Sequence, residues 1–255
     1  LDLAITNFSD EPTRLLFGAE IGYDDVSYRY GLNSESRALL SWGTHLIDFD
    51  GDGYLELFTA NGHVYPQADE ELTGTQYAQR DTLWSLGPEQ RAVPIDPSGE
   101  RSLLALDRGT RGSAVGDING DGRPDLLISA IDAPAILGVN NAGPESSRLS
   151  LRLLGPQKEA NERPRTPRDG TGARCVLVIG EGPTERALLS ESYTAAGYQS
   201  ASSPWLYFGM GSEEEFQSIR IQWPSGAVEE LSGGLANRRL WIREGEGIVK
   251  EEPLQ

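Results

Sequence analysis

Short runs of alternating apolar and polar residues recur along most of the chain, separated by turns rich in glycine and proline. Residues 149–154 read Leu-Ser-Leu-Arg-Leu-Leu, and further strand-like runs occupy residues 173–179, 184–190, 205–208, 218–223 and 239–243. A period of two is typical of a β-strand with one buried face, and long helical patterns are few. With 30 glycines and 15 prolines among 255 residues, the pattern predicts an all-β protein of many short strands joined by turns.

Two apolar strands in the first half of the chain lead into closely matched acidic turns. Residues 41–47 run into Asp48, and residues 110–116 run into Asp117. In both strands a bulky or charged residue precedes a glycine, and strand-like runs follow both turns. Residues 1–7 resemble the end of the same unit. We interpret these segments as two copies, and the end of a third copy, of one repeat.

The first acidic turn places carboxylates at alternate positions and then bends at glycine. Calcium takes six to eight oxygen ligands at about 2.3–2.6 Å, so a short loop must direct several carboxylates and a backbone carbonyl inward. The predicted ligands are Asp48, Asp50, Asp52, the carbonyl of Tyr54, and Glu56. Without an ion these carboxylates would repel one another strongly. The turn is not an EF-hand, because the twelfth position is Thr59, within a β-type run, where an EF-hand has glutamate.

The second acidic turn repeats this pattern and strengthens the calcium interpretation. Its predicted ligands are Asp117, Asn119, Asp121, the carbonyl of Arg123, and Asp125. A single acidic turn is equally well explained as a solvated hairpin, but two matched copies, each leading into a strand, favour metal binding. The sequence therefore predicts two calcium ions with a structural role.

The composition narrows the classes of partner. The formal net charge of −17 argues against nucleic acid and anionic membrane surfaces as partners, and two calcium ions would change it only to −13 because each adds two charges. No apolar run approaches the length of a membrane span, so membrane insertion is not expected. The single cysteine, Cys175, permits no intrachain disulfide and is predicted to be buried in a strand.

The spacing of the repeats predicts the domain organisation. The acidic turns begin 69 residues apart, which is longer than a typical propeller blade, so we expect an insertion at residues 62–80. Repeats of this kind must stack to bury their faces, and radial stacking gives a β-propeller. We predict propeller blades in residues 1–147 and a small β-sandwich or barrel in residues 148–255, with a mobile loop at residues 155–170. The chain is expected to be a piece of a longer protein, with further blades or an oligomer partner covering its open edges.

Several motifs resemble those of proteins in which FG-GAP/VCBS repeats precede an ASPIC/UnbV domain, as in the cartilage acidic protein family. The motifs are Asn61-Gly62-His63-Val64-Tyr65-Pro66, Tyr77-Ala78-Gln79-Arg80, Thr171-Gly172-Ala173-Arg174, Gly197-Tyr198-Gln199-Ser200, Phe208-Gly209-Met210-Gly211 and Trp223-Pro224-Ser225-Gly226. The resemblance covers nearly the whole chain, and the motifs occur in the same order. It implies a calcium-loaded, integrin-like propeller with a C-terminal β module, usually exported.

The chain departs from this family pattern at three places. Glu56 stands where the repeats usually carry aspartate, which lengthens that ligand. The segment Leu83-Trp84-Ser85-Leu86 replaces a strand that usually ends in asparagine, so this blade is expected to have drifted. Met210 replaces a common leucine, a change that conserves volume.

The functional hypothesis is a non-catalytic, calcium-binding extracytoplasmic module for adhesion, protein–protein interaction or surface assembly. His63 has no partnered nucleophile in the sequence pattern and is interpreted as structural, and His45 as a packed residue beside the first turn. The alternative is a calcium-stabilised carbohydrate-active enzyme or a glycan-binding propeller. A subunit of a surface filament is a third possibility. The expected partners are a protein or glycan ligand at a surface, and the expected location is secreted, periplasmic or on the cell surface.

Overall fold

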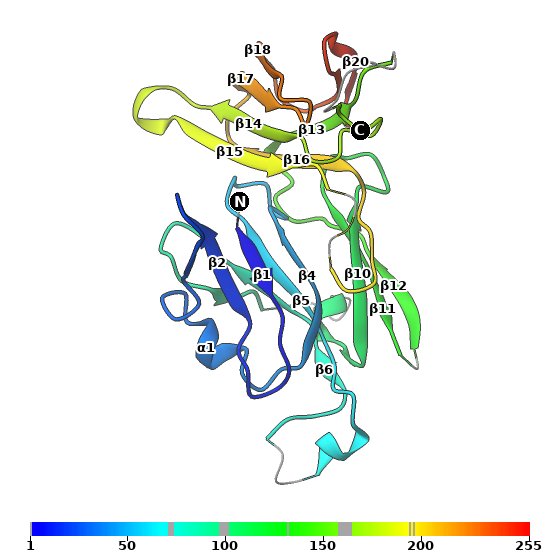
Figure 1. Cartoon of the computed structure of the whole chain (residues 1–255). Helices are drawn as coiled ribbons and strands as arrows, with labels where there is room; N and C mark the ends of the chain where they lie inside the picture. The colour runs from blue at the N-terminus through cyan, green and yellow to red at the C-terminus, as the bar shows by residue number, and fades with distance from the viewer. Residues whose placement is uncertain are drawn as a thin grey trace.

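The computed structural model describes residues 2–70, 74–96, 102–131, 133–157, 165–193, 195 and 197–255. In the described residues, three antiparallel sheets of three or four strands, with a further two-stranded sheet, form the first part of the molecule in a propeller-like arrangement, and two four-stranded sheets form the second part above them (Figure 1). The all-β class and the propeller-like arrangement predicted from the sequence are confirmed. No helix in the described part of the chain is long and apolar enough to span a membrane.

The three sheets of the propeller-like part follow one another along the chain. The first sheet contains β1 (Leu3–Ile5), β2 (Arg14–Gly18) and β3 (Tyr23–Asp25). The second contains β4 (Ser41–Ile47), β5 (Glu56–Asn61), β7 (Thr82–Ser85) and β8 (Val93–Pro94). The third contains β10 (Thr110–Gly116), β11 (Asp125–Ala130) and β12 (Ala133–Gly138). Shorter elements lie between them: α1 (Leu32–Glu35), η1 (Pro66–Asp69), β6 (Gln79–Arg80), η2 (Leu103–Ala105) and β9 (Asp107–Arg108).

Strand β5 lies between two hydrophobic cores. Leu57 packs in a core with Leu15 of β2 and Trp84 of β7, whereas Phe58 packs in a core with Ile128 of β11. All six residues of β5 are buried. Because both faces of this strand are covered, the adjacent residues Leu57 and Phe58 are both apolar, and the strand shows no clean alternation.

The second part is a β-sandwich. One sheet has the order β16 (Trp205–Gly211), β13 (Ser147–Leu154), β19 (Arg238–Arg243) and β20 (Gly247–Pro253). The other has the order β15 (Arg186–Glu191), β14 (Arg174–Ile179), β17 (Glu215–Gln222) and β18 (Val228–Leu235), with the short η3 (Gly182–Thr184) before β15. Alternate residues of β13 and β14, including Leu151 and Leu177, meet in one core between the sheets. Cys175 is buried in this core, and burial raises the pKa of its thiol.

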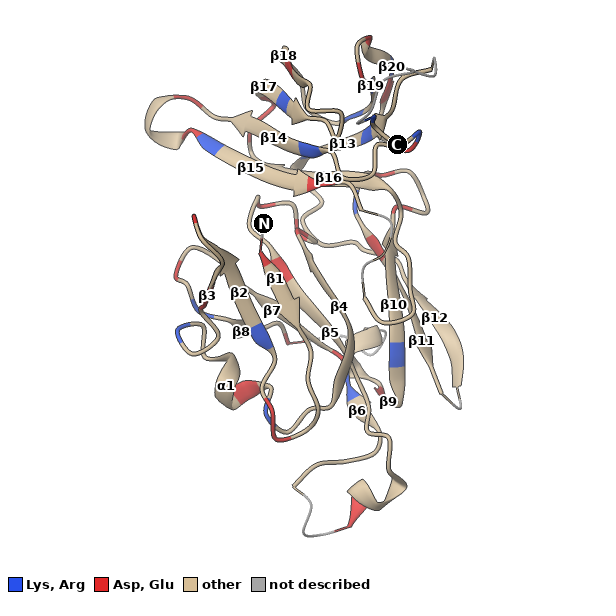
Figure 2. Cartoon of the chain, in the orientation of Figure 1, with Lys and Arg blue, Asp and Glu red and all other residues tan. Residues whose placement is uncertain are grey.

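Two strands of the sandwich have no counterpart in the sequence prediction. Strand β18 exposes most of its residues, and β20 exposes nearly all of them; each lies at the edge of a sheet. Strands of this kind lack the apolar alternation that a buried face imposes. The predicted insertion at residues 62–80 contains η1 and β6, with residues 71–73 outside the described chain, and residues 158–164 of the loop predicted to be mobile are also outside it. Acidic residues are spread over both parts of the chain (Figure 2).

The acidic loops as a candidate metal centre

Both predicted acidic turns lie where the propeller-like part meets the sandwich, and the same hydrogen bonds build them. In the first loop, the carboxylate of Asp48 accepts the backbone N–H of Gly51 at 2.6 Å and that of Gly53 at 2.8 Å. In the second loop, Asp117 accepts the corresponding N–H groups of Gly120 at 2.7 Å and Gly122 at 2.8 Å. All four glycines have φ between 80° and 87°, a region in which an L side chain is strained. Sequence and backbone therefore agree on a repeated turn.

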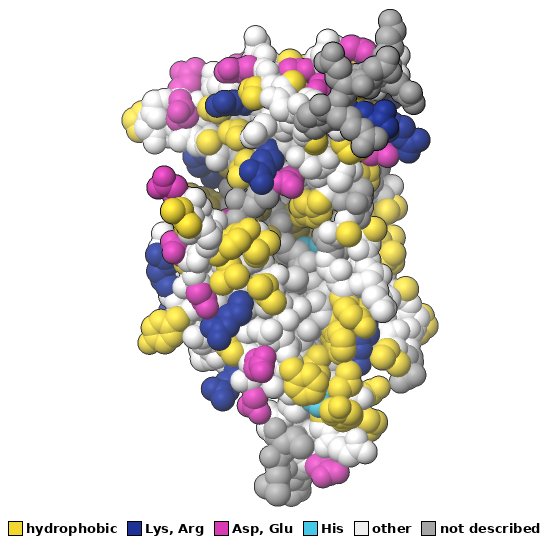
Figure 3. Space-filling model, viewed as in Figure 1, with side chains coloured by type: hydrophobic (Ala, Val, Ile, Leu, Met, Phe, Trp, Pro, Cys, Tyr) yellow, Lys and Arg dark blue, Asp and Glu magenta, His cyan; other side chains and the backbone are white. Residues whose placement is uncertain are grey.

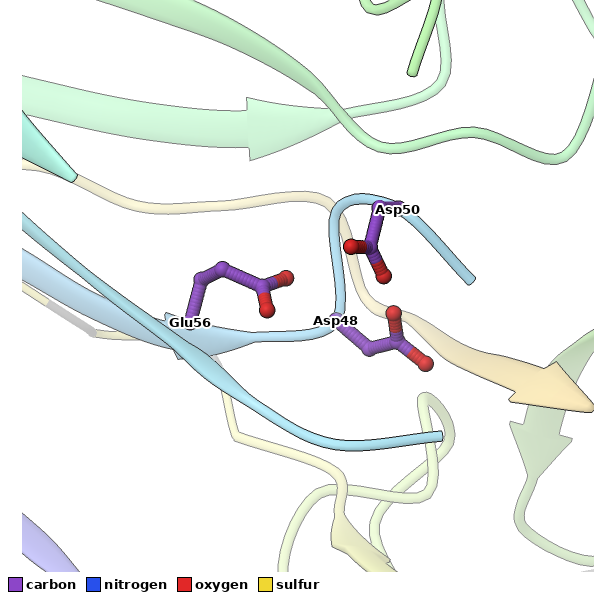
Figure 4. Close-up of side chains that lie close together, drawn as sticks. All are labelled: Asp48, Asp50 and Glu56. Atoms are coloured by element: carbon purple, nitrogen blue, oxygen red, sulfur yellow. The ribbon is translucent and has the colours of Figure 1, made fainter. Parts of the chain in front are cut away.

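Three carboxylates of the first loop converge. Asp48, Asp50 and Glu56 each offer one oxygen atom, and these atoms lie within 4.8 Å of one another. Figure 4 shows the carboxylate of Glu56 directed toward Asp50. Glu56 is 1% exposed, and its Oε2 accepts the backbone N–H of Phe49 at 2.8 Å. Its Oε1 is buried with no hydrogen-bond donor in the described part of the chain.

Burial makes this cluster costly to ionise. Desolvation, with a smaller contribution from the neighbouring aspartates, raises the pKa of Glu56 to about 8 and that of Asp48 to about 6. A bound divalent cation would offset both effects and would give Oε1 of Glu56 a partner. The donor set consists of oxygen atoms, which suits a hard cation such as calcium. The residues of the first loop therefore fit the predicted ion.

Asp52, another predicted ligand of the first loop, is not one of these three carboxylates. Asp52 is exposed, and its carboxylate accepts the backbone N–H of Tyr54 at 2.7 Å. The assignment of Asp52 and of the Tyr54 carbonyl as ligands stays a prediction.

The carboxylates of the second loop are occupied by groups of the chain itself. Asp117, whose side chain is 1% exposed, forms an ion pair with Arg239 of β19. Asp121 pairs with Arg123 and accepts the side-chain amide of Asn119 at 2.8 Å. Asp125 accepts the backbone N–H of Ile118 at 2.8 Å with one oxygen and that of Asn140 at 2.8 Å with the other. The structure therefore does not present the five predicted ligands of this loop as a converging set of free oxygens.

The sheet register explains why the last carboxylates of the two loops differ. Leu126 of β11 pairs with Gly138, and two residues later the N–H of Asn140 reaches Asp125. The first sheet has the same arrangement at Asp2, whose carboxylate accepts the N–H of Gly18 at 3.0 Å. In each case the strand that follows brings a backbone donor to the carboxylate.

The second sheet lacks this donor. Leu57 of β5 pairs with Trp84, so Leu86 occupies the place of Asn140. The N–H of Leu86 instead donates to the carbonyl of Leu55 at 3.2 Å. Oε1 of Glu56 is therefore left for another partner. The sequence shows this departure as Leu86 in place of the usual asparagine, but the consequence for Glu56 appears only in the register.

The sandwich packs directly against both loops. The Arg148 guanidinium of β13 donates to the carbonyls of Asp50 at 2.9 Å and Gly143 at 3.1 Å, and Gly211 N–H donates to the carbonyl of Gly51 at 2.8 Å. A Cβ atom at Gly209 would lie 2.0 Å from Oδ2 of Asp48, so this approach requires glycine.

The second loop is joined to the sandwich in a comparable way. The N–H of Asp117 donates to the hydroxyl of Tyr207 at 3.0 Å, and the N–H of Gln255 donates to the carbonyl of Gly120 at 3.0 Å. Sequence reasoning missed the contacts of the sandwich with both loops because the partners are about 90 to 160 residues apart, but the Phe208-Gly209-Met210-Gly211 motif carried a signal in its glycines.

Neither histidine forms part of this centre. Nδ1 of His63 accepts the backbone N–H of Tyr65 at 3.1 Å, so Nε2 carries the proton and donates to Oγ of Ser9 at 3.2 Å. In this tautomer His63 cannot accept a proton from Ser9. Nε2 of His45 lies 3.0 Å from Oγ of Ser113, and burial lowers the pKa of His45 to about 4.

Family comparisons agree with both parts of this architecture. The FG-GAP repeat model matches residues 109–144, and the ASPIC and UnbV model matches residues 163–249. No match was found among curated proteins. The matched FG-GAP repeat and ASPIC/UnbV domain suggest an integrin-like protein-interaction module. The chain combines an FG-GAP repeat with an ASPIC/UnbV domain, as its motifs predict.

Proposed function

We propose that this chain is a non-catalytic, calcium-binding interaction module, in which calcium in the first acidic loop stabilises the joint between the propeller-like part and the sandwich. The observation that carries the proposal is the buried, unpartnered Oε1 of Glu56 beside the carboxylates of Asp48 and Asp50. A buried oxygen of this kind costs about 1–3 kcal/mol when left unsatisfied, and more when charged. A calcium ion would remove that cost.

Calcium at the first loop would act on the joint because the same loop contacts the sandwich. Arg148 and Gly211 hold the carbonyls of Asp50 and Gly51, which are part of the loop that would close around the ion. The ion would therefore fix the loop in the conformation that the sandwich contacts. The second loop is the weaker of the two predicted calcium sites, because Arg239 already supplies a positive charge to Asp117.

The proposal also covers the role and location of the module. Its function would lie in the surfaces that the joined parts present to a protein or glycan ligand. The resemblance to exported proteins supports a secreted, periplasmic or cell-surface location.

Thermal melting of the purified chain in excess calcium and in EGTA tests this proposal. Saturation to about 100 times Kd stabilises a protein by about 2.7 kcal/mol, which for a chain of this size raises Tm by roughly 5–10 °C. We expect this rise for the wild type and for E230Q, which removes the same charge from an exposed residue of β18. E56Q should show little or no rise. Equal melting temperatures for the wild type in calcium and in EGTA would contradict the proposal.

A further inference from the structure

A groove lies between the sandwich and the propeller-like part, beside the first loop. Its volume is about 360 Å³, within the range of roughly 300–1,000 Å³ that is typical of ligand sites. Residues 187–192 line one side and residues 45–48 line another, with residues 205–209 of β16 completing it. Figure 3 shows the surface hollowed between the two parts of the molecule.

The open edge of β15 forms one wall of this groove. Strand β15 is the terminal strand of its sheet, with β14 on its other side. Six consecutive residues, 187–192, line the groove, whereas a strand that presents only one face would contribute alternate residues. The groove therefore runs along the edge of the strand, where backbone N–H and C=O groups point away from the sheet. A six-residue strand gives an edge about 20 Å long.

The charged side chains that line the groove are acidic, and they lie among apolar and neutral polar side chains. Leu46, Leu55 and Leu189 contribute apolar surface, and Leu189 is 50% exposed. The charged residues among the described lining are Asp2, Asp48 and Glu191, and none is a lysine or arginine. Calcium bound at Asp48 would leave the other two as the acidic groups of the groove. Glu191 also pairs with Arg174 of β14 at 2.9 Å, which orients its carboxylate.

We propose that the groove binds an extended peptide of a partner protein, with alternating apolar and basic side chains, which adds as a strand to the edge of β15. Main-chain hydrogen bonds to the edge would supply affinity, and the apolar and acidic walls would select the side chains. A second copy of this chain is disfavoured as the occupant, since its net charge of −17 is repelled by the acidic groove. The inference rests on the proposed interaction function and names the chemistry of its partner.

Binding of three capped ten-residue peptides, measured by fluorescence anisotropy with and without calcium, tests the inference. The peptides alternate Val with Lys, Val with Glu, and Ser with Lys. We expect the Val-Lys peptide to bind, and each of the other two to bind at least tenfold more weakly. Equal binding of the Ser-Lys and Val-Lys peptides would mean that charge alone attracts them, and would overturn the proposal.

A matched pair of variants locates the site. L189K places a cation in the groove, and V228K places one at a residue that is 53% exposed on β18, the opposite edge of the same sheet. We expect L189K to weaken binding of the Val-Lys peptide at least tenfold and V228K to leave it within about twofold, with equal melting temperatures as the check on folding. If L189K binds the Val-Lys peptide as tightly as the wild type does, the groove is not the peptide site. If calcium does not raise the melting temperature but L189K still weakens peptide binding, the calcium role is wrong and the peptide groove stands.

Discussion

The two acidic loops share a turn but differ in what surrounds their carboxylates. In the second loop, Arg239 pairs with Asp117, and backbone N–H groups occupy both oxygens of Asp125. In the first loop, one oxygen of Glu56 has no donor in the described chain, and Arg148 contacts a carbonyl of the loop and not a carboxylate. The two loops therefore share one backbone turn. In the second loop, groups of the protein itself satisfy the carboxylates, whereas the first loop fits an added cation.

This difference shows how a repeat can diverge without losing its fold. The FG-GAP match covers residues 109–144, which include the second loop and not the first. The copy that departs from the family pattern, at Glu56 and Leu86, is the one that forms the candidate metal centre. At the end of β7 the backbone N–H of Leu86 donates to the carbonyl of Leu55, and Oε1 of the longer glutamate has no donor in the described chain.

Asp81 is a buried carboxylate outside the acidic loops, and both of its hydrogen-bond donors are neutral. Its protonation can be compared with that of Glu56. Its oxygens accept the N–H of Asn61 at 2.8 Å and the hydroxyl of Thr110 at 3.3 Å, and burial raises the pKa of Asp81 to about 7. Because its folded pKa lies above the unfolded value, Asp81 contributes most stability below about pH 4 and loses it as pH rises toward 7.

We therefore expect the free energy of unfolding of D81N to rise by roughly 3 kcal/mol relative to that of the wild type between pH 4 and pH 7.5. Urea unfolding in EGTA at the two pH values measures this change. The opposite effect of the buried His45, whose pKa is about 4, is common to both proteins and cancels. If the difference in free energy of unfolding between D81N and the wild type does not change with pH, Asp81 stays ionised. Burial alone would then not explain why the carboxylates of the first loop favour a bound cation.

The Arg239–Asp117 pair gives the next largest effect. R239M leaves the buried carboxylate of Asp117 without its cation, at an expected cost of about 2–3 kcal/mol in EGTA, below the full cost of a buried pair because Arg239 is partly exposed. Added calcium should recover part of this loss by binding to the second loop. The readout is chemical denaturation with and without calcium.

R238M is the matched control on the same strand. Arg238 pairs with Glu251, which is 53% exposed, so its removal is expected to cost less than about 1 kcal/mol with no calcium dependence of its own. If R239M and R238M destabilise the protein equally, the charge of Arg239 does not stabilise the carboxylate of Asp117.

Shortening Glu56 by one methylene is expected to weaken calcium binding at the first loop. E56D keeps the charge and the bond to Phe49, but it withdraws the second oxygen from Asp48 and Asp50. We expect calcium affinity to fall about tenfold, equivalent to about 1.4 kcal/mol, in a calorimetric titration. D125E, the reverse change in the second loop, should not create a tight site while Arg239 is present. An affinity gain in D125E would contradict the role given to Arg239.

The smallest expected effect concerns Arg186, the arginine of the sandwich that reaches the first loop from β15. Its guanidinium donates to the carbonyl of Asp52 at 3.1 Å and lies 5.3 Å from the ring of Tyr54. Because it contacts no carboxylate of the cluster, R186M should cost less than about 1 kcal/mol and leave calcium affinity within about threefold. A large loss of affinity would show that the first loop also depends on an arginine.

The sequence predicts those features that local patterns control. Alternation located the strands with one buried face, such as β13 and β14, and the acidic turns with their glycines appear where the residues place them. Edge strands β18 and β20 were missed because most of their residues are exposed, so that their sequences carry little apolar alternation. The loops were predicted as two copies of one calcium-binding turn because acidic or amide side chains and glycines recur in both at the same spacing.

What distinguishes the loops is set by distant residues. Arg239 meets Asp117 across 122 residues, and the absence of a donor for Glu56 follows from the register of β5 with β7. Neither can be read from the turn itself. Leu86 in place of asparagine was visible in the sequence, but its effect depends on the pairing of Leu57 with Trp84, which only the folded sheet defines.

Isothermal titration of calcium into the wild type, E56Q and D125N shows which loop holds the tighter calcium site, because E56Q and D125N each remove one carboxylate from the corresponding position of one loop. We expect the tightest site of the wild type to be lost in E56Q and retained in D125N. Loss of the tightest site in D125N with retention in E56Q, or two sites of equal affinity in the wild type, would contradict this expectation.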